Sequence, residues 1–341
     1  MTVYGGDIVL NESITTSTNS GHILIKAAGN IRMLGEKILS TQGANVILWA
    51  NSDGGATLGD IALQSNFSGS TGGRVQTNGG HIWLGGGSGT TTWNGITVGN
   101  GYAVSGSAIS FLNDPSSGSL PSGVLFQGAK LLSGGGNIYV GGQSQQSNSR
   151  AVVTTGPVEI NSGSGTIEIQ AIATSTAGAL GTGWNHVSSV PAMNGNFTIT
   201  SSNATSSAIL LNADATASNV VGGDFQDEGS GLAGVVSLRT TNGGGLVYNS
   251  LGSSARAAAY GLRLGYSTNQ GGTLELLSNS GNITLNTGNR RIFLSNNLTN
   301  TTLGFKATTP ITASTSEVKL VTNNLSASGA LNFNTSGQLI I

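Results

Sequence analysis

The chain has 341 residues, of which 55 are glycine and only 8% are charged, and its formal net charge is −1. This balance excludes the basic surface by which proteins bind nucleic acid or anionic lipid. Cysteine is absent, which excludes disulfides, thiol catalysis and cysteine-bearing zinc sites. No segment reaches the roughly 18 apolar residues of a membrane-spanning helix, so no membrane insertion is expected.

One five-residue phrase recurs along the chain: glycine, a small or polar residue, an apolar residue, any residue, and a second apolar residue. Each copy combines a turn signal with a short strand whose two apolar side chains point the same way. Copies begin at Gly6, Gly21, Gly59, Gly80, Gly136, Gly165, Gly195 and Gly281. Self-similarity of this kind is typical of a solenoid, so an all-β fold is predicted.

The spacing of the phrases predicts three short strands per coil and about 20 residues per coil. Residues 1–341 would then form one continuous array of roughly 17 coils, about 80 Å long at the usual strand spacing. Glycine and asparagine are expected at corners with positive φ, and threonine, serine and asparagine in hydrogen-bonded ladders between coils. Because strand phrases occur at both ends, we expect a fragment of a longer protein.

Some stretches lack the phrase and carry proline, tryptophan or acidic residues, and we expect irregular loops or insertions there. They lie near 90–123, 174–193 and 213–234. The last contains the densest carboxylate cluster, which is Asp224, Asp227 and Glu228. No basic residue accompanies the cluster at a defined spacing, so a solvated loop is the favoured interpretation. A polysaccharide lyase or hydrolase that uses these carboxylates is an alternative.

Three aromatic residues are candidate binding residues. Trp83 and Tyr139 occupy the middle position of the phrase, where strand alternation directs a side chain away from the core. Trp93 lies in the adjacent irregular stretch. Exposed rings stack on sugars or on a protein partner, so a carbohydrate-binding module is a further alternative. The opposing interpretation is that a loop or insertion covers these rings.

The three histidines are interpreted as structural. His22 and His81 directly follow the glycine of the phrase, where Asp7 and Asn137 stand in other copies, so a polar role in the turn is expected. His186 lies far from both in the sequence. We predict no catalytic residue, no metal ligand and no cofactor.

The cleanest phrase, Gly-Asn-Ile-Thr-Leu at 281–285, and the segments 45–55, 79–89 and 93–102 resemble the β-helical repeats of filamentous-haemagglutinin-type bacterial surface adhesins. The resemblance implies a single-stranded, right-handed parallel β-helix, exported to the cell surface or the extracellular space. It implies a rigid stalk or multivalent adhesive surface whose partners are surface glycans, other cell-surface proteins and neighbouring repeats. The Asn-Pro-Asn-Gly secretion motif of two-partner systems is absent, so an interior stalk segment is expected.

Overall fold

The fold is known from a computed structural model. It describes residues 1–17, 21–54, 59–65, 71–105, 122–145, 150–174, 182–186, 196–215, 223–227, 235–251, 260–266, 273–278, 281–286, 291–296, 303–306, 311–315, 317–322, 325–328, 331–335 and 339–340. In these ranges the regular structure is entirely β, arranged as three sheets. No helix that could cross a membrane occurs among the described residues.

We name the sheets A, B and C. The main path of sheet A is β1 (Thr2–Gly5), β4 (Ile23–Ala27), β7 (Val46–Ala50), β10 (Ile82–Trp93), β15 (Ile138–Ser144), β18 (Ile167–Ala173), β21 (Ile209–Asp214), β24 (Leu246–Leu251), β27 (Ile283–Asn286), β30 (Ile311–Thr315) and β33 (Leu331–Thr335). Off this path, β11 (Ile96–Gly101) pairs with β10, and β12 (Ala103–Val104) pairs with β15.

Sheets B and C have no such branches in the described part of the chain. Sheet B runs through β2 (Ile8–Leu10), β5 (Ile31–Leu34), β8 (Ile61–Gln64), β13 (Ser122–Gln127), β16 (Arg150–Thr155), β19 (Thr182–His186), β22 (Gly223–Asp227), β25 (Tyr260–Tyr266), β28 (Arg291–Asn296), β31 (Glu317–Thr322) and β34 (Leu339–Ile340). Sheet C runs through β3 (Ile14–Thr15), β6 (Ile38–Ser40), β9 (Arg74–Gln76), β14 (Lys130–Leu132), β17 (Val158–Gly163), β20 (Phe197–Ser201), β23 (Val235–Thr240), β26 (Thr273–Ser278), β29 (Leu303–Lys306) and β32 (Leu325–Ser328).

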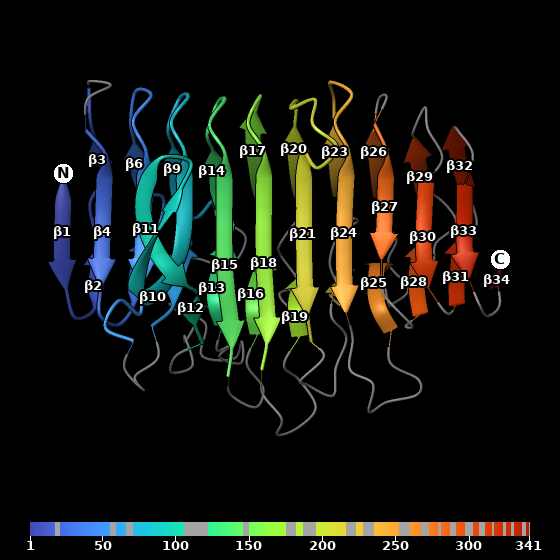
Figure 1. The fold of residues 1–341 in the computed structure, drawn as a ribbon, viewed down its shortest axis with the longest axis horizontal. Coiled ribbons are helices and arrows are strands. Elements are labelled where there is room, and N and C mark those ends of the chain that lie inside the picture. The colour runs from blue at the N-terminus through green and yellow to red at the C-terminus, as the bar shows by residue number, and fades with distance from the viewer. Residues whose placement is uncertain are drawn as a thin grey trace.

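The chain visits the three sheets in turn, and most strands pair in parallel with the strand three places later. The strands β8, β9 and β10 pair instead with the strand five places later, because β11 and β12 intervene in the sequence. The strands therefore stack along the long axis of the molecule, with the N-terminus at one end and the C-terminus at the other (Figure 1). The all-β prediction, with parallel pairing between successive layers, is confirmed for the described residues.

The predicted layer spacing holds only in places. Ile311 lies opposite Leu331, 20 residues later, but Ile82 lies opposite Ile138, 56 residues later. The main path of sheet A in the described chain has 11 strands rather than 17. At 4.7–4.9 Å per step this sheet is about 50 Å long, not 80 Å. The estimate was wrong because long segments separate many of the strands.

The interior is one continuous apolar cluster with members from all three sheets, such as Ile23, Ile31 and Leu39, each fully buried. Inner and outer positions alternate along the strands, as in β4 and β18. The two apolar positions of the phrase therefore face inward, because period-2 alternation places them on the same side. This part of the sequence prediction is confirmed.

The glycine is required in several copies of the phrase for a reason that sequence reasoning did not supply. Corner residues such as Gly43 and Asn78 do have positive φ, as predicted. Gly136 and Gly165 do not, but a Cβ on Gly136 would overlap the carbonyl of Gly80, and one on Gly165 would overlap the carbonyl of Gly136. Close approach of successive layers, rather than backbone conformation, therefore excludes a side chain here.

Buried hydroxyls form one of the predicted ladders, at the corner between sheets C and A. Thr41 Oγ1 donates to the carbonyl of Ala44 in its own corner at 2.5 Å and lies 3.2 Å from the carbonyl of Thr77 in the next layer. Thr77 Oγ1 is shared in the same way between the carbonyls of Gly80 and Ser133, at 2.5 and 3.1 Å, and Ser133 Oγ between those of Gly136 and Ser162. The side chains of Thr41, Thr77, Ser133 and Ser162 are all fully buried. The ladder satisfies interior polar groups that would otherwise destabilise the fold.

A second ladder explains the polar residue of the phrase. His22 Nδ1 accepts from the backbone N–H of Asn45 at 3.3 Å, and Asn45 Oδ1 accepts from that of His81 at 2.7 Å. His81 Nδ1 accepts from the N–H of Asn137 at 2.8 Å, and Asn137 Oδ1 from that of Thr166 at 2.9 Å. Each layer thus accepts a hydrogen bond from the next, which confirms the structural role predicted for His22 and His81.

The three stretches expected to be irregular each contribute strands. The first holds the end of β10, β11, β12 and the start of β13; the second holds β19, and the third holds β22. Residues 106–121, 175–181, 187–193, 216–222 and 228–234 of these stretches lie outside the described part of the chain.

Candidate functional site

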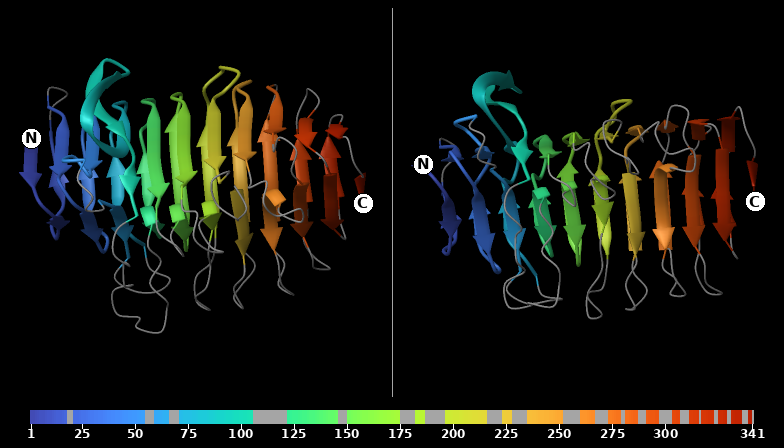
Figure 2. Two further views of the ribbon diagram at one scale, coloured as in Figure 1. Left: turned by 60° about the horizontal axis from the view of Figure 1, so that its bottom comes forward. Right: turned by 90° about the horizontal axis from the view of Figure 1, so that it is seen from below.

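The site is created where β10 leaves sheet A. β10 pairs in parallel with β7 as far as Gly86, then continues as an antiparallel ribbon with β11. The ribbon closes at Asn94 and Gly95, which both have positive φ as a tight hairpin turn requires. The chain then rejoins sheet A as β12, where Ala103 lies opposite Gly142. The ribbon crosses the outer face of sheet A (Figure 1) and stands out beyond the neighbouring strands (Figure 2).

This ribbon was missed by sequence reasoning, although a signal for it is present. Asn94-Gly95 is a two-residue hairpin turn, and Trp93 and Ile96 flank it. Such an Asn-Gly pair is the strongest short-range signal for a hairpin. The long β10 strand hid it, because glycine and threonine dominate 85–92 and suggest a loop.

An apolar cluster, here called the outer cluster, fastens the ribbon to sheet A. Its buried members are Ile47, Trp49, Trp83, Ile96 and Val98, with Leu24, Trp93 and Tyr139 partly buried against them. It is separate from the interior core. The indole Nε1 of Trp49 donates to the carbonyl of Gly87 at 2.7 Å, so the ribbon is also held by a hydrogen bond.

The aromatic rings of the outer cluster contact one another. Trp83 and Tyr139 are register partners, and their rings lie 5.8 Å apart at an interplanar angle of 9°. Trp93 comes from the ribbon and meets Tyr139 at 6.0 Å and 57°. Gly85 and Gly141 follow on the same face, and a Cβ there would crowd the rings of Trp83 and Tyr139 respectively. The glycines therefore let these rings lie against the strands.

The structure brings all three predicted binding residues together, but it corrects their exposure. Trp83 points away from the core as predicted, yet it is only 2% exposed, because the ribbon covers it. Trp93 and Tyr139 keep intermediate exposure. A role of these residues in binding stays a prediction.

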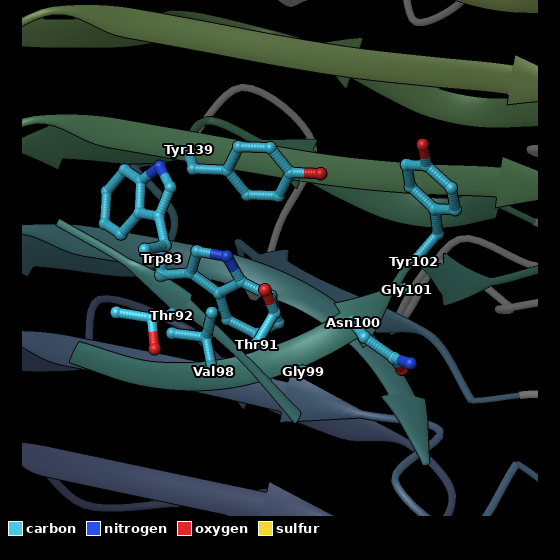
Figure 3. Close-up of a pocket in the computed structure, with 10 residues that line it drawn as sticks. Trp83, Thr91, Thr92, Val98, Gly99, Asn100, Gly101, Tyr102 and Tyr139 are labelled. Atoms are coloured by element: carbon cyan, nitrogen blue, oxygen red, sulfur yellow. The ribbon is translucent and has the colours of Figure 1, made fainter. Parts of the chain in front are cut away.

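A pocket of about 300 Å³ lies between the ribbon and sheet A (Figure 3). Its lining comprises Trp83, Thr91, Thr92, Trp93, Val98, Gly99, Asn100, Gly101, Tyr102 and Tyr139. Figure 3 shows the rings of Trp83 and Tyr139 side by side, with the Tyr139 hydroxyl directed toward the end where Tyr102 lies. Thr91, Thr92 and Asn100 are exposed. Sequence reasoning missed these three and Tyr102, because their contribution depends on the ribbon.

The electrostatics of the pocket favour protonated phenols. Burial raises the pKa of Tyr139, and nearby Tyr102 and Glu168 raise it further. Burial also raises the pKa of Tyr102, with added contributions from Glu168 and Asp214. Both hydroxyls therefore remain hydrogen-bond donors at neutral pH. No residue that lines the pocket carries a formal charge.

His81 lies beside the pocket and contacts both the ribbon, through Trp93, and the next layer of the sheet, through Asn137. Its ring meets that of Trp93 edge-on at 5.5 Å, while its Nδ1 accepts the inter-layer hydrogen bond from Asn137. Burial, and then the proximity of His22, lower the pKa of His81. The neutral imidazole is the form that fits this position, because a protonated Nδ1 could not accept.

The acidic cluster predicted to lie in a solvated loop is placed differently. Asp224 and Asp227 belong to β22, and the loop interpretation is wrong for both. The backbone of Asp224 is in register with Arg263 of β25. Glu228 lies outside the described residues.

Asp60 is a buried carboxyl that sequence reasoning did not single out. It is fully buried, and burial raises its pKa to about 7, against the opposing influence of Arg32, with a smaller upward contribution from Asp7. Its backbone N–H donates to Asn30 Oδ1 at 3.0 Å, and the N–H of Asn30 donates to Asp7 Oδ1 at 2.8 Å. The residue thus continues an inter-layer ladder in sheet B. Among the described residues, no cluster of three or more His, Asp or Glu could hold a metal ion.

The pocket combines an aromatic floor with hydroxyl and amide groups at its rim. Such a site can hold a small ligand that has both an apolar face and polar groups. Comparison with known proteins finds no match for this chain among protein-family models, curated proteins or solved structures.

Proposed function

We propose that this chain is a rigid, non-enzymatic segment of an exported bacterial surface adhesin. Its sheets A, B and C would be the three sides of a single-stranded, right-handed parallel β-helix. The observation that supports this is the parallel pairing of strands from successive layers in three sheets, around one apolar interior. Layers that pack only on their neighbours produce a stiff, extendable rod.

The outer face of sheet A is the proposed adhesive surface. Its middle-position row carries, in register, Trp83, Tyr139, Glu168 and Leu210, while the inner positions beside them stay apolar. Outer side chains can therefore change without altering the core. Weak contacts to surface glycans or cell-surface proteins, repeated along a rod, add through effective concentration.

The proposal is tested by measuring adhesion against copy number. Beads carrying one, few or many copies of the chain are passed over glycan-coated and cell-derived surfaces under flow. Retention that rises more steeply than the number of copies is expected for a multivalent adhesin. Small-angle scattering of the same chain should show an elongated particle. A compact particle, or retention no greater than that of uncoated beads, contradicts the proposal.

Polysaccharide processing is the second candidate, because the backbone register places Asp224 opposite Arg263. A lyase or hydrolase would need at least a carboxylate together with a cationic residue that stabilises the developing negative charge, and an arginine supplies the cation. The test is release of reducing ends or unsaturated uronates from a panel of neutral and uronic-acid glycans. Turnover that Asp224→Asn removes would support this candidate, and absence of turnover across the panel would reject it.

A further inference from the structure

We propose that the pocket between the ribbon and sheet A binds a single neutral pyranose ring. This inference deepens the proposed adhesive function and rests on it for its biological role. It assigns a site and a ligand class to the surface, and it predicts that acidic sugars are rejected.

The aromatic geometry is the first argument. A pyranose presents an apolar face of C–H groups that packs on an aromatic ring, while its hydroxyls need polar partners at the edge. Tyr139 and Trp93 retain exposed area and meet at 57°, so one ring offers a face and the other an adjoining wall. Trp83 is buried beside Tyr139 and serves to hold that ring in place.

Size is the second argument. About 300 Å³ is the lower limit of ordinary small-molecule sites, which suits one sugar ring rather than several. Ribbon residues, among them Thr91, Thr92 and Val98, form one side of the pocket (Figure 3), so the ring would enter as a chain end or a side branch.

Polar groups suited to sugar hydroxyls surround the aromatic floor. Thr91 and Thr92 are exposed at the rim and provide hydroxyls that both donate and accept. Asn100 Oδ1 accepts from the backbone N–H of Gly89 at 3.0 Å, which orients the amide and leaves its NH₂ group as a donor. Tyr102 and Tyr139 add protonated phenols at the inner end.

The charge around the pocket is the third argument, and it favours neutral sugars over acidic ones. The lining carries no cation that could pair with a carboxylate or sulfate. Glu168 is in register with Tyr139, and its Oε1 is held by Gln170 Nε2 at 2.8 Å. Asp214 lies close enough to influence Tyr102. Lys26 Nζ lies 3.8 Å from the centroid of the Trp49 ring and does not line the pocket. An anionic sugar would therefore meet the repulsion of Glu168 without a cation in the lining to pair with it.

The test uses the full chain and soluble probes. Methyl galactoside, methyl glucoside and N-acetylglucosamine are compared with galacturonic and glucuronic acid, by calorimetry and by saturation-transfer NMR. At least one neutral probe should bind, and its acidic counterpart should bind about tenfold more weakly or not at all. Tetramethylammonium is included because aromatic rings also bind such cations.

Variants locate the binding. Tyr139→Ala and Trp93→Ala should each weaken binding of the neutral probe about tenfold. Tyr4→Ala is the matched control, because Tyr4 is a 70% exposed tyrosine of the same sheet, on β1. Tyr102→Phe removes only a hydroxyl and should weaken binding of the neutral probe by less than tenfold. This variant keeps the test valid if a truncation to alanine releases the ribbon. Glu168→Gln should leave neutral binding unchanged and narrow the difference from the acidic probe.

Several results would overturn the inference. These are binding of no neutral probe, neutral binding unaffected by Tyr139→Ala in a folded chain, or binding of tetramethylammonium alone. Failure of the site can be told from failure of the adhesive function. Beads that adhere although no neutral probe binds reject the site alone, whereas probes that bind although no beads adhere reject the adhesive role alone.

Discussion

Two stretches of sheet A share an inner face and differ on the outer one. In β7, β10 and β15, as in β18, β21 and β24, the inward residues are buried apolar side chains, for example Ile82, Ile138, Ile167 and Leu246. The outer face of the first stretch is apolar and aromatic and lies under the ribbon. The outer face of the second stretch has no such cover in the described chain and mixes apolar side chains, such as Leu210 and Val247, with asparagines that hydrogen-bond to one another.

A ladder of asparagine side chains runs along the outer face of the second stretch and continues to Asn286 of β27. Asn249 Nδ2 donates to Asn212 Oδ1 at 2.8 Å, and Asn286 Nδ2 donates to Asn249 Oδ1 at 3.3 Å. On the first stretch the ribbon buries the outward apolar rings, and on the second the outward asparagine amides hydrogen-bond to one another. The comparison teaches that the core sets the layers while the outer face can be specialised layer by layer.

The largest expected effect concerns the glycine that both stretches share. Gly136→Ala should lower the free energy of unfolding by about 2 kcal/mol or more, because its Cβ would overlap backbone that cannot move aside. Gly165→Ala, at the start of the other stretch, should be similarly destabilising, since its Cβ would overlap the carbonyl of Gly136. Urea denaturation followed by circular dichroism measures both.

Gly21→Ala is the matched control for these two substitutions. Apart from its chain neighbours, no atom of the described residues lies within 4 Å of the position its Cβ would take, so the denaturation midpoint of this variant should be unchanged or slightly raised. An equal decrease in the free energy of unfolding at all three positions would contradict the explanation that close backbone approach excludes a Cβ at Gly136 and Gly165.

The next effect should be confined to the first stretch. Val98→Asp places a charge in the outer cluster, where Val98 is fully buried, and should lower the free energy of ribbon docking by about 2 kcal/mol or more. Amide hydrogen exchange in 88–100 should become faster, while β18 and β21 stay protected. Thr97→Ala, at an exposed position of the same strand, is the control. Faster exchange throughout the sheet would show that the ribbon supports the rod, against this prediction.

A smaller effect is expected from the ladder of the second stretch. Asn249→Ala removes both amide hydrogen bonds of this residue to its neighbours and should lower the free energy of unfolding by about 1 kcal/mol. The exposed Asn11→Ala serves as control and should leave the denaturation midpoint unchanged. A decrease in the free energy of unfolding as large as that caused by Gly136→Ala would mean that contacts on the outer face stabilise the stacking of the layers as much as the core does.

The smallest effect is a pH dependence at the edge of the ribbon. The pKa of His81 is lowered by burial, so the unfolded chain binds the proton more readily. Stability from this group is therefore present above the usual histidine pKa of about 6.5 and is lost as the pH falls below it. His81→Asn keeps an acceptor in the ladder, as Asn45 and Asn137 do, without the titration. Denaturation midpoints between about pH 7 and pH 5 should fall less in the variant than in the parent chain. An identical fall in both proteins would assign the pH dependence to other groups.

Much of the layer structure could be predicted from sequence, because the phrase encodes it locally. Alternation places Ile138 and Val140 inward and Tyr139 outward whatever surrounds them. The role of His22 and His81 in the turn followed from the residues that replace them in other copies. The spacing of layers could not be predicted, because the segments between strands vary in length and leave no trace in the phrase.

The candidate site shows the same division. Sequence placed Trp83 and Tyr139 at outward positions and Trp93 in an adjacent loop. It did not reveal the contact between Trp83 and Tyr139, the burial of Trp83 or the contributions of Thr91, Asn100 and Tyr102. Those depend on where the ribbon lies, which only Asn94-Gly95 signalled. Asp224 was likewise misplaced, because an acidic segment can still pair as a strand within a sheet.

By itself the sequence determined the β class, the inward pair of apolar residues in each phrase and the direction in which the middle side chain points. These follow from the period of a strand, which is a local property of the backbone. Only the tertiary structure decided which outward side chains are covered, which layers become neighbours, and why copies of the phrase such as the one at Gly136 cannot begin with a larger residue. Those depend on contacts between residues as far apart as Gly80 and Gly136, where the backbones of successive layers leave no room for a Cβ.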